Sequence, residues 1–281
     1  MIKGISYWAL ENDPDIVKAL ADAKSAGFEA LELAIGTEGH LTVDATEEQC
    51  SDIRAACDDS GLVVETLASA MSWKCNPVSD DPAERAMAIE QNRKAIERAA
   101  WLGCSSYLLV PGVICNPWNP NNAVRYDRAV ERATRLVGEL LETAEQMGVE
   151  ICIENVWNGM FYSPLELAEF IDLFDSDYVG VYFDVGNVIG CHAYPPHWIE
   201  ILGQRILRVH VKGFRWEPET NSWKFCRLLD GEVPWQRVVK ALQGIGYDKT
   251  IIAEVSPPGG DLLEATSAGL DQILAYGRAI D

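Results

Sequence analysis

One pattern recurs along the whole chain: a short apolar run, a loop, and then an amphipathic segment, usually closed by a glycine. The apolar runs have the length of buried strands, and the longer segments have the apolar spacing of helices. We expect strands at residues 5–10, 28–33, 62–68, 106–110, 149–153, 181–183, 206–211 and 250–253. We expect helices at 14–26, 46–60, 81–102, 126–147, 163–174, 198–204, 235–242 and 262–279.

Eight strand–helix units in 281 residues predict a (β/α)8 TIM barrel. No linker or composition shift interrupts the pattern, so we expect a single domain over residues 1–281. A doubly wound open sheet is the alternative, but such sheets usually carry a glycine-rich dinucleotide loop or a phosphate loop, and the sequence has neither. In barrels of this kind the chemistry lies at the carboxyl ends of the strands.

The composition excludes several classes of protein. A hydrophobic content of 48% with 23% charged residues is that of a globular chain. The formal net charge of −20 repels polyanions, so we expect no nucleic-acid partner and explain the charge by solubility. No apolar run approaches the roughly 18 residues of a membrane span, and no signal peptide is recognised, so we predict a cytoplasmic protein without a membrane partner. The eight cysteines are scattered without a Cys-x-x-Cys pair, as reduced thiols are.

Polar residues stand at the ends of the last four predicted strands. Glu154 follows the fifth, Asp184 the sixth, His210 lies in the seventh and Glu254 follows the eighth. Each alone is a weak signal, and a lone histidine such as His210 is more often a core residue. Together they form a set of carboxylate oxygens and one imidazole nitrogen, which suits Mn²⁺ best, with Mg²⁺, Co²⁺ or Zn²⁺ as alternatives.

Ion pairing is the structural alternative to a metal site. In that case the strand-end acids would pair with Arg208, Lys212 and Arg215 at the mouth of the barrel. Three acids gathered at one mouth repel one another unless a cation lies between them. We therefore favour a metal ion over ion pairs alone.

The order of these motifs resembles the xylose isomerase-like TIM barrel superfamily, which includes sugar-phosphate isomerases and epimerases. The resemblance covers nearly the whole chain and rests on four motifs: Ile153-Glu154-Asn155, Phe183-Asp184-Val185-Gly186-Asn187, Val209-His210-Val211-Lys212 and Ala253-Glu254. It implies a metal-dependent sugar or sugar-phosphate epimerase or isomerase, of the ketose 3-epimerase or pentulose- or hexulose-phosphate type. It also suggests a dimer or a tetramer.

The resemblance also implies roles for the strand-end residues. Glu154, Asp184, His210 and Glu254 would be metal ligands, and Glu154 and Glu254 would also be the catalytic acid/base pair. A bound metal acidifies the C–H beside a ketose carbonyl and stabilises the enediolate that forms. One carboxylate then removes a proton and the other returns one to the opposite face, which inverts the carbon centre.

Other residues are candidates for binding the substrate. Asn187 stands where the ketose 3-epimerase branch has a substrate-binding histidine, and the Gly-Asn pair resembles the sugar-phosphate branch. Trp8 could stack on a sugar or pack at the rim, Glu32 could bind sugar hydroxyls or a cation, and His192 could contact the substrate. A phosphate would bind among the most concentrated basic residues near the mouth, which are Lys212, Arg215, Lys224 and Arg227. Tryptophans in post-strand loops, at positions 73, 118, 157 and 216, favour a sugar-sized pocket.

Four other functions remain open from the sequence. A keto-sugar or keto-inositol dehydratase or lyase would use the same proton abstraction and then expel a β-hydroxyl. A metal-dependent hydrolase needs more histidine ligands than the four histidines of this chain readily supply. A glycoside hydrolase would keep its activity in EDTA, and a non-catalytic sugar-binding barrel would exchange no substrate hydrogen.

Overall fold

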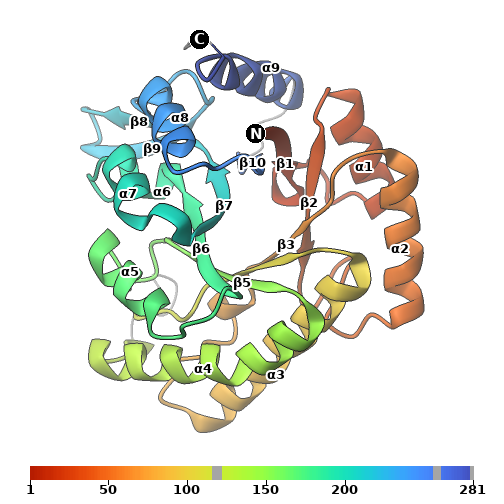
Figure 1. Cartoon of the computed structure of the whole chain (residues 1–281), viewed down its shortest axis with the longest axis vertical. Helices are drawn as coiled ribbons and strands as arrows, with labels where there is room; N and C mark the ends of the chain where they lie inside the picture. Colours follow the sequence, from red (N-terminus) through yellow and green to blue (C-terminus); the bar gives the residue numbers. More distant parts are fainter. Residues whose placement is uncertain (116–121, 256–260, 279–281) are drawn as a thin grey trace. The chain divides into compact units, whose positions relative to one another are not determined.

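The fold is a closed barrel of parallel strands. The computed structural model describes residues 1–115, 122–255 and 261–278. Within these residues eight strands close in the order β1-β10-β7-β6-β5-β4-β3-β2, which confirms the predicted (β/α)8 barrel (Figure 1). The barrel strands are β1 (Ile2–Ser6), β2 (Ala30–Ile35), β3 (Thr66–Ser69), β4 (Ser106–Leu109), β5 (Glu150–Glu154), β6 (Val179–Asp184), β7 (Ile206–Val211) and β10 (Thr250–Ala253).

Helices separate the barrel strands along the chain, and their ends carry the local signals seen in the sequence. They are α1 (Ile16–Ser25), α2 (Glu47–Ser60), α3 (Pro82–Leu102), α4 (Tyr126–Met147), α5 (Pro164–Asp172), α6 (Val185–Gly190), α7 (Pro195–Leu202), α8 (Trp235–Gly244) and α9 (Leu262–Ala275). Thr46 and Gln49 form a capping box before α2, because the backbone N–H of each donates to the side-chain oxygen of the other. Gly103 ends α3 at a φ of 78°, a conformation that favours glycine.

Backbone contacts divide the chain into two compact units. The first comprises Met1–Glu32, Ala56–Val64 and Phe183–Asp281, and the second Leu33–Ala55 and Glu65–Tyr182. The boundary passes through β2 and β6, so each unit contains one part of both strands. The single domain expected over residues 1–281 stays a prediction.

The core is formed by strands that are buried on both faces. All six residues of β6 are buried, and so are all four of β3, β4 and β10. Such strands read as continuous apolar runs, which is why most of them were found in the sequence. Burying each large aliphatic side chain stabilises the fold by about 1.5–3 kcal/mol.

The predicted bounds of the first strand, 5–10, are wrong. The strand β1 spans Ile2–Ser6, and a 3₁₀ turn, η1 (Tyr7–Ala9), follows it. The side chain of Ser6 accepts a hydrogen bond from the backbone N–H of Trp8 and so caps this turn. Residues 2–5 instead pair with β10 and form the closing seam of the barrel.

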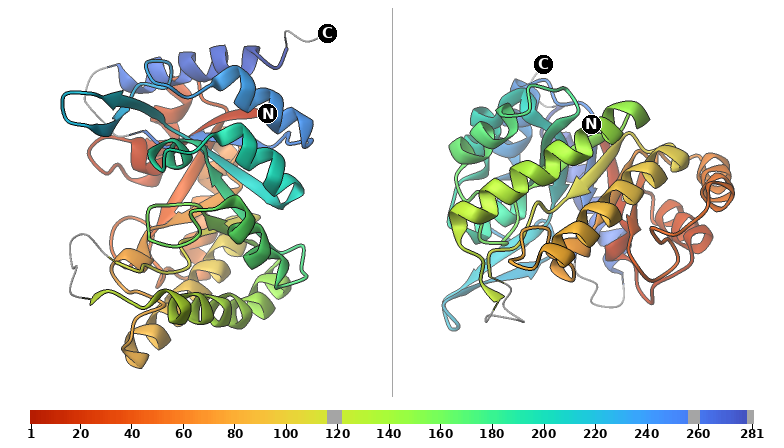
Figure 2. Two further views of the ribbon diagram at one scale, coloured as in Figure 1. Left: turned by 90° about the vertical axis from the view of Figure 1, so that its left-hand side faces the viewer. Right: turned by 90° about the horizontal axis from the view of Figure 1, so that it is seen from below.

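Two further elements are absent from the sequence-based assignment. Directly after β6 the chain forms the short helix α6, with Asp184 as its N-cap. The segment after β7 forms an antiparallel hairpin of β8 (Gly213–Glu217) and β9 (Ser222–Cys226), which extends away from the rest of its unit (Figure 2). In this segment charged and aromatic residues alternate, which is the pattern of an exposed hairpin.

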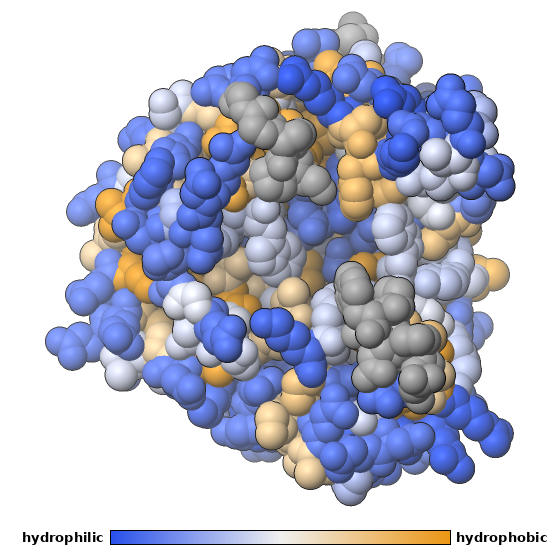
Figure 3. Space-filling view, turned by 180° about the vertical axis from the view of Figure 1, so that it is seen from behind, coloured by the Kyte–Doolittle hydropathy of each residue, from blue (hydrophilic) through white to orange (hydrophobic). Residues whose placement is uncertain are grey.

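On the face shown in Figure 3, hydrophilic residues predominate and hydrophobic residues form smaller groups between them. In the described residues, no helix combines the length and the apolar character that crossing a membrane requires.

Candidate metal centre

Three of the predicted ligands meet within the first compact unit. Asp184 ends β6, His210 is the next-to-last residue of β7, and Glu254 directly follows β10. One ligand atom from each of the three lies within 4.8 Å of the others. Asp184 and His210 are completely buried. The carboxyl ends of parallel strands thus bring together residues that are 26 and 44 positions apart in sequence.

Backbone hydrogen bonds hold two of these carboxylate residues in place. The Oδ1 atom of Asp184 accepts the backbone N–H of Asn187 at 2.8 Å, because Asp184 caps the first turn of α6. The backbone N–H of Glu254 donates to the carbonyl of Val211 at 3.0 Å and extends the β10–β7 ladder by one residue. The candidate substrate residue Asn187 is itself buried and here positions Asp184 through its backbone.

His210 is oriented by Glu32, which is also completely buried. The His210 Nε2 atom lies 2.8 Å from Oε1 of Glu32, and its Nδ1 atom lies 3.5 Å from Oε2 of Glu254. Burial lowers the pKa of His210, but the carboxylates of Glu32 and Glu254 raise it well above its usual value. A carboxylate bound to one ring nitrogen fixes the orientation of the ring, as it does for histidines that bind metals.

Lys212 lies among the same carboxylates. Its Nζ atom is 2.8 Å from Oδ2 of Asp184 and 2.6 Å from Oε2 of Glu254. Burial raises the pKa of Glu254, but the positive charge of Lys212 and the contact with His210 lower it to about 2. Glu254 is therefore an anion at neutral pH. The carboxyl groups of Asp184 and Glu254 and the imidazole of His210 fit a divalent metal ion, which prefers hard oxygen and nitrogen donors.

Glu154 belongs to the second compact unit. It is the last residue of β5, is 7% exposed, and pairs in register with Tyr182 of β6. Its assignment as a fourth ligand stays a prediction.

The basic residues predicted to bind phosphate all have carboxylate partners. Lys212 pairs with Asp184 and Glu254, as described above. Arg215 lies 3.3 Å from Glu217, and Lys224 pairs with the same carboxylate. The two contacts lower the pKa of Glu217, with the hydrogen bond from Lys224 as the main cause. Arg227 pairs with Asp261 at 2.6 Å. A phosphate would have to displace these carboxylates.

His192 is part of an aromatic cluster with the hairpin residues Trp216 and Trp223. The ring centroid of His192 lies 5.7 Å from each tryptophan, and the Nε1–H of Trp223 points to the His192 Nδ1 atom at 3.3 Å. Trp223 was not singled out in the sequence, because the hairpin that carries it was missed. Trp8 is partly buried in η1, and Trp118 lies outside the described residues.

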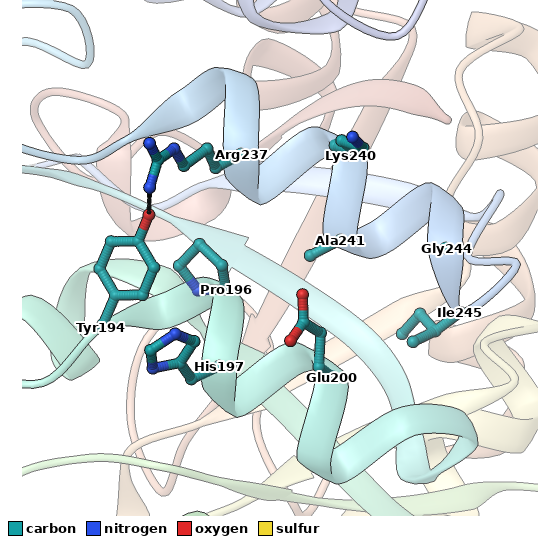
Figure 4. Close-up of a pocket in the computed structure, with 9 residues that line it drawn as sticks. All are labelled: Tyr194, Pro196, His197, Glu200, Arg237, Lys240, Ala241, Gly244 and Ile245. Carbon is teal, nitrogen blue, oxygen red and sulfur yellow. Dashed lines mark hydrogen bonds between the residues drawn. The ribbon is translucent and has the colours of Figure 1, made fainter.

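A hollow of about 650 Å³ lies between α7 and α8, in the first unit. Figure 4 shows the guanidinium of Arg237 turned toward Tyr194, whose hydroxyl accepts its hydrogen bond at 3.0 Å, and the carboxylate of Glu200 directed into the hollow. None of the residues predicted to bind metal or substrate lines it.

Comparison with known proteins identifies relatives of the same architecture. The model of the xylose isomerase-like TIM barrel family matches residues 20–275. A D-psicose 3-epimerase of Ruminiclostridium cellulolyticum is 23% identical over 254 residues, which cover 89% of this chain and 81% of the relative. The structure of D-psicose 3-epimerase with D-tagatose from Clostridium cellulolyticum H10 has a TM-score of 0.82 at 19% identity and covers 99% of both chains. A structure of L-ribulose 3-epimerase has a TM-score of 0.80 at 18% identity and covers 99% of this chain and 95% of that one. The chain belongs to the xylose isomerase-like TIM barrel family.

Proposed function

We propose that this protein is a divalent-metal-dependent ketose epimerase that inverts the carbon next to the carbonyl by proton transfer. The observation that carries the proposal is the convergence of Asp184, His210 and Glu254 at the carboxyl ends of their strands. The match to ketose 3-epimerases over most of the chain supports it.

The metal site would comprise Glu154, Asp184, His210 and Glu254. Glu154 ends the strand beside β6, and its partner in that strand, Tyr182, lies two residues before Asp184. We assign Mn²⁺ as the preferred ion, since the donor set is rich in carboxylates, with Mg²⁺, Co²⁺ and Zn²⁺ as alternatives. The ion would polarise the ketose carbonyl and stabilise the negative charge that develops on its oxygen.

Glu154 and Glu254 would carry out the two proton transfers. In the metal-free protein Lys212 holds Glu254 as a carboxylate, and a bound divalent ion would hold it in the same form. A carboxylate is the form that accepts a proton. Glu154, from another strand, would return a proton to the opposite face of the substrate. Inversion requires two such groups, one on each face.

An unphosphorylated ketose is the substrate we propose. The basic residues that could bind a phosphate are paired with Asp184, Glu254, Glu217 and Asp261. The relatives carry the names of psicose and ribulose epimerases, which are named for free ketoses. The aromatic cluster of His192, Trp216 and Trp223 offers ring faces of the kind that bind sugars.

Hydrogen exchange tests this proposal. The metal-loaded protein is incubated in D₂O with a panel of ketoses, ketose phosphates and keto-inositols, and deuterium incorporation is followed by NMR. We expect exchange at the carbon next to the carbonyl and formation of the epimer, without loss of water from the substrate. A dehydrated product would instead indicate a lyase.

Variants identify the acid/base pair in the same assay. We expect Glu254→Gln and Glu154→Gln to reduce exchange by about 10²–10⁴-fold, the usual contribution of general acid–base catalysis. Glu131→Gln is the matched control, since Glu131 is 69% exposed on α4. Exchange that persists in either strand-end variant would remove that residue from the acid/base assignment.

Assembly and location are further proposals. We propose a dimer or a tetramer, as the family resemblance suggests, and light scattering of the full chain would measure it. We also propose a cytoplasmic protein that acts on a small molecule and binds neither membranes nor nucleic acid. The eight free cysteines suit a reducing compartment, and the net charge of −20 disfavours polyanions.

A further inference from the structure

The ammonium group of Lys212 lies inside the candidate metal centre. It contacts Oδ2 of Asp184 at 2.8 Å and Oε2 of Glu254 at 2.6 Å, and the residue is 5% exposed. The same two carboxylates are predicted to bind the metal. A single side chain thus provides a positive charge to two of the predicted ligands.

The course of the lysine side chain is tightly confined. A Cβ atom at Gly186, in α6, would lie 2.1 Å from Cγ and 3.1 Å from Cδ of Lys212. Glycine at this position therefore lets the lysine stem run directly past the helix. The outer end of the side chain lies near Phe225 of β9, whose ring centroid is 5.9 Å from Nζ.

Charge neutralisation explains why an ammonium group occupies this position. Carboxylates that lie this close together repel each other unless a cation is placed between them. In the metal-free protein Lys212 supplies that cation. A divalent ion would need the same oxygens, and two cations cannot share them without strong repulsion.

We propose that Lys212 is an internal counter-cation, which holds the two carboxylates together in the metal-free protein and withdraws when a divalent ion binds. This inference rests on the metal site of the proposed function. The confined stem limits the withdrawal to the end of the side chain, where the face of Phe225 offers the ammonium a favourable alternative position. Lys212 therefore lowers the affinity of the site for metal.

A titration of the metal-free protein with Mn²⁺, followed by calorimetry without substrate, tests this inference. In Lys212→Met, which keeps the length of the side chain and removes its charge, we expect Mn²⁺ to bind about tenfold more tightly or better, because the competing cation is lost. We also expect the metal-free variant to melt at a lower temperature than the wild type, since its carboxylates lose their counter-charge.

Lys224→Met is the matched control. Lys224 lies on the same hairpin as Phe225, and its side chain is 50% exposed. This variant makes the same change in net charge, and we expect its Mn²⁺ affinity to stay within about twofold of the wild type, because exposed charges are screened by salt. An equal gain in both variants, or unchanged or weaker binding in Lys212→Met, overturns the inference.

Phe225→Leu provides a second variant in case Lys212→Met does not fold. It removes the aromatic face without changing a charge, at a side chain that is 48% exposed. We expect Mn²⁺ to bind about two- to fivefold more weakly, the equivalent of one cation–π contact at an exposed site. Unchanged or tighter binding contradicts the withdrawal toward this ring.

The test separates this inference from the proposed function. If the wild type binds Mn²⁺ and exchanges ketose hydrogen, but Lys212→Met binds no more tightly, only the inference fails. If Lys212→Met gains affinity and no ketose exchanges, only the proposed reaction fails. If neither protein binds a divalent ion, both fail.

Discussion

Single residues in the candidate centre have roles that depend on their partners. Glu32 was expected to contact a sugar hydroxyl or a cation, and the structure places its carboxylate on the imidazole of His210. Lys212 was expected to bind a phosphate or, in the ion-pair alternative, to pair with the strand-end acids, and it does contact two of those acids, Asp184 and Glu254. In the proposed metal site, Glu32 would act on the metal through His210 and Lys212 would act by competition.

The contact between Glu32 and His210 leads to a prediction for Glu32→Gln. The variant keeps a hydrogen-bond acceptor for His210 but removes the charge that raises its basicity. We expect the affinity for Mn²⁺ to fall by about 10–100-fold, the usual effect of changing the partner of a metal-binding histidine. Glu29→Gln, an exposed position just before β2, is the control. Calorimetric titration of both variants measures the difference, and equal affinities would exclude the role of Glu32.

Short elements next to the barrel position these residues. Helix α6 begins at Val185 and is capped by Asp184, so a predicted metal ligand is also the first anchor of a helix. The hairpin β8–β9 brings Phe225 to the ammonium of Lys212 and two tryptophans to His192. The sequence analysis predicted neither of these two elements, although both contribute to the site.

Glycine substitutions test the close packing of α6. Gly186→Ala would force a methyl group against Lys212, and we expect it to destabilise the protein by about 1–3 kcal/mol, as overpacking does. Gly138→Ala is the matched change in α4, where an added Cβ meets no atom within 4 Å. We expect that variant to be more stable by about 0.5–1 kcal/mol, because alanine favours the helix. Urea denaturation measures both free energies, and a destabilised Gly138→Ala would show that helix propensity does not control that site.

At the scale of the whole molecule, the barrel closes where the first strand meets the last. Ile2 to Ile5 of β1 pair in register with Thr250 to Ala253 of β10. Lys3 strengthens this seam from outside, since its Nζ atom lies 2.7 Å from Asp271 and 3.1 Å from the hydroxyl of Ser267, both on α9. The last helix is thereby tied to the first strand.

Lys3→Met tests the contribution of this contact. The variant removes an ion pair and a hydrogen bond from a largely buried side chain, and we expect a loss of about 1–2 kcal/mol in the free energy of unfolding, because Asp271 stays hydrated. Lys18→Met, in an exposed pair with Asp22, should change it by less than about 0.5 kcal/mol. Urea denaturation of the metal-free protein compares the two, and similar losses would show that the seam gains nothing from Lys3.

The sequence by itself determined the fold class and the positions of the strand-end acids. Periodicity is a local property, so alternating apolar runs and amphipathic segments predicted the barrel, and Asp184 and Glu254 were identified because they follow buried strands. The tertiary structure decided the boundary of β1, the hairpin, and the partners of Glu32 and Lys212. The β1–β10 pairing joins residues 248 positions apart, and Glu32 and Lys212 reach His210 and Asp184 across 178 and 28 positions. No local pattern encodes such distances.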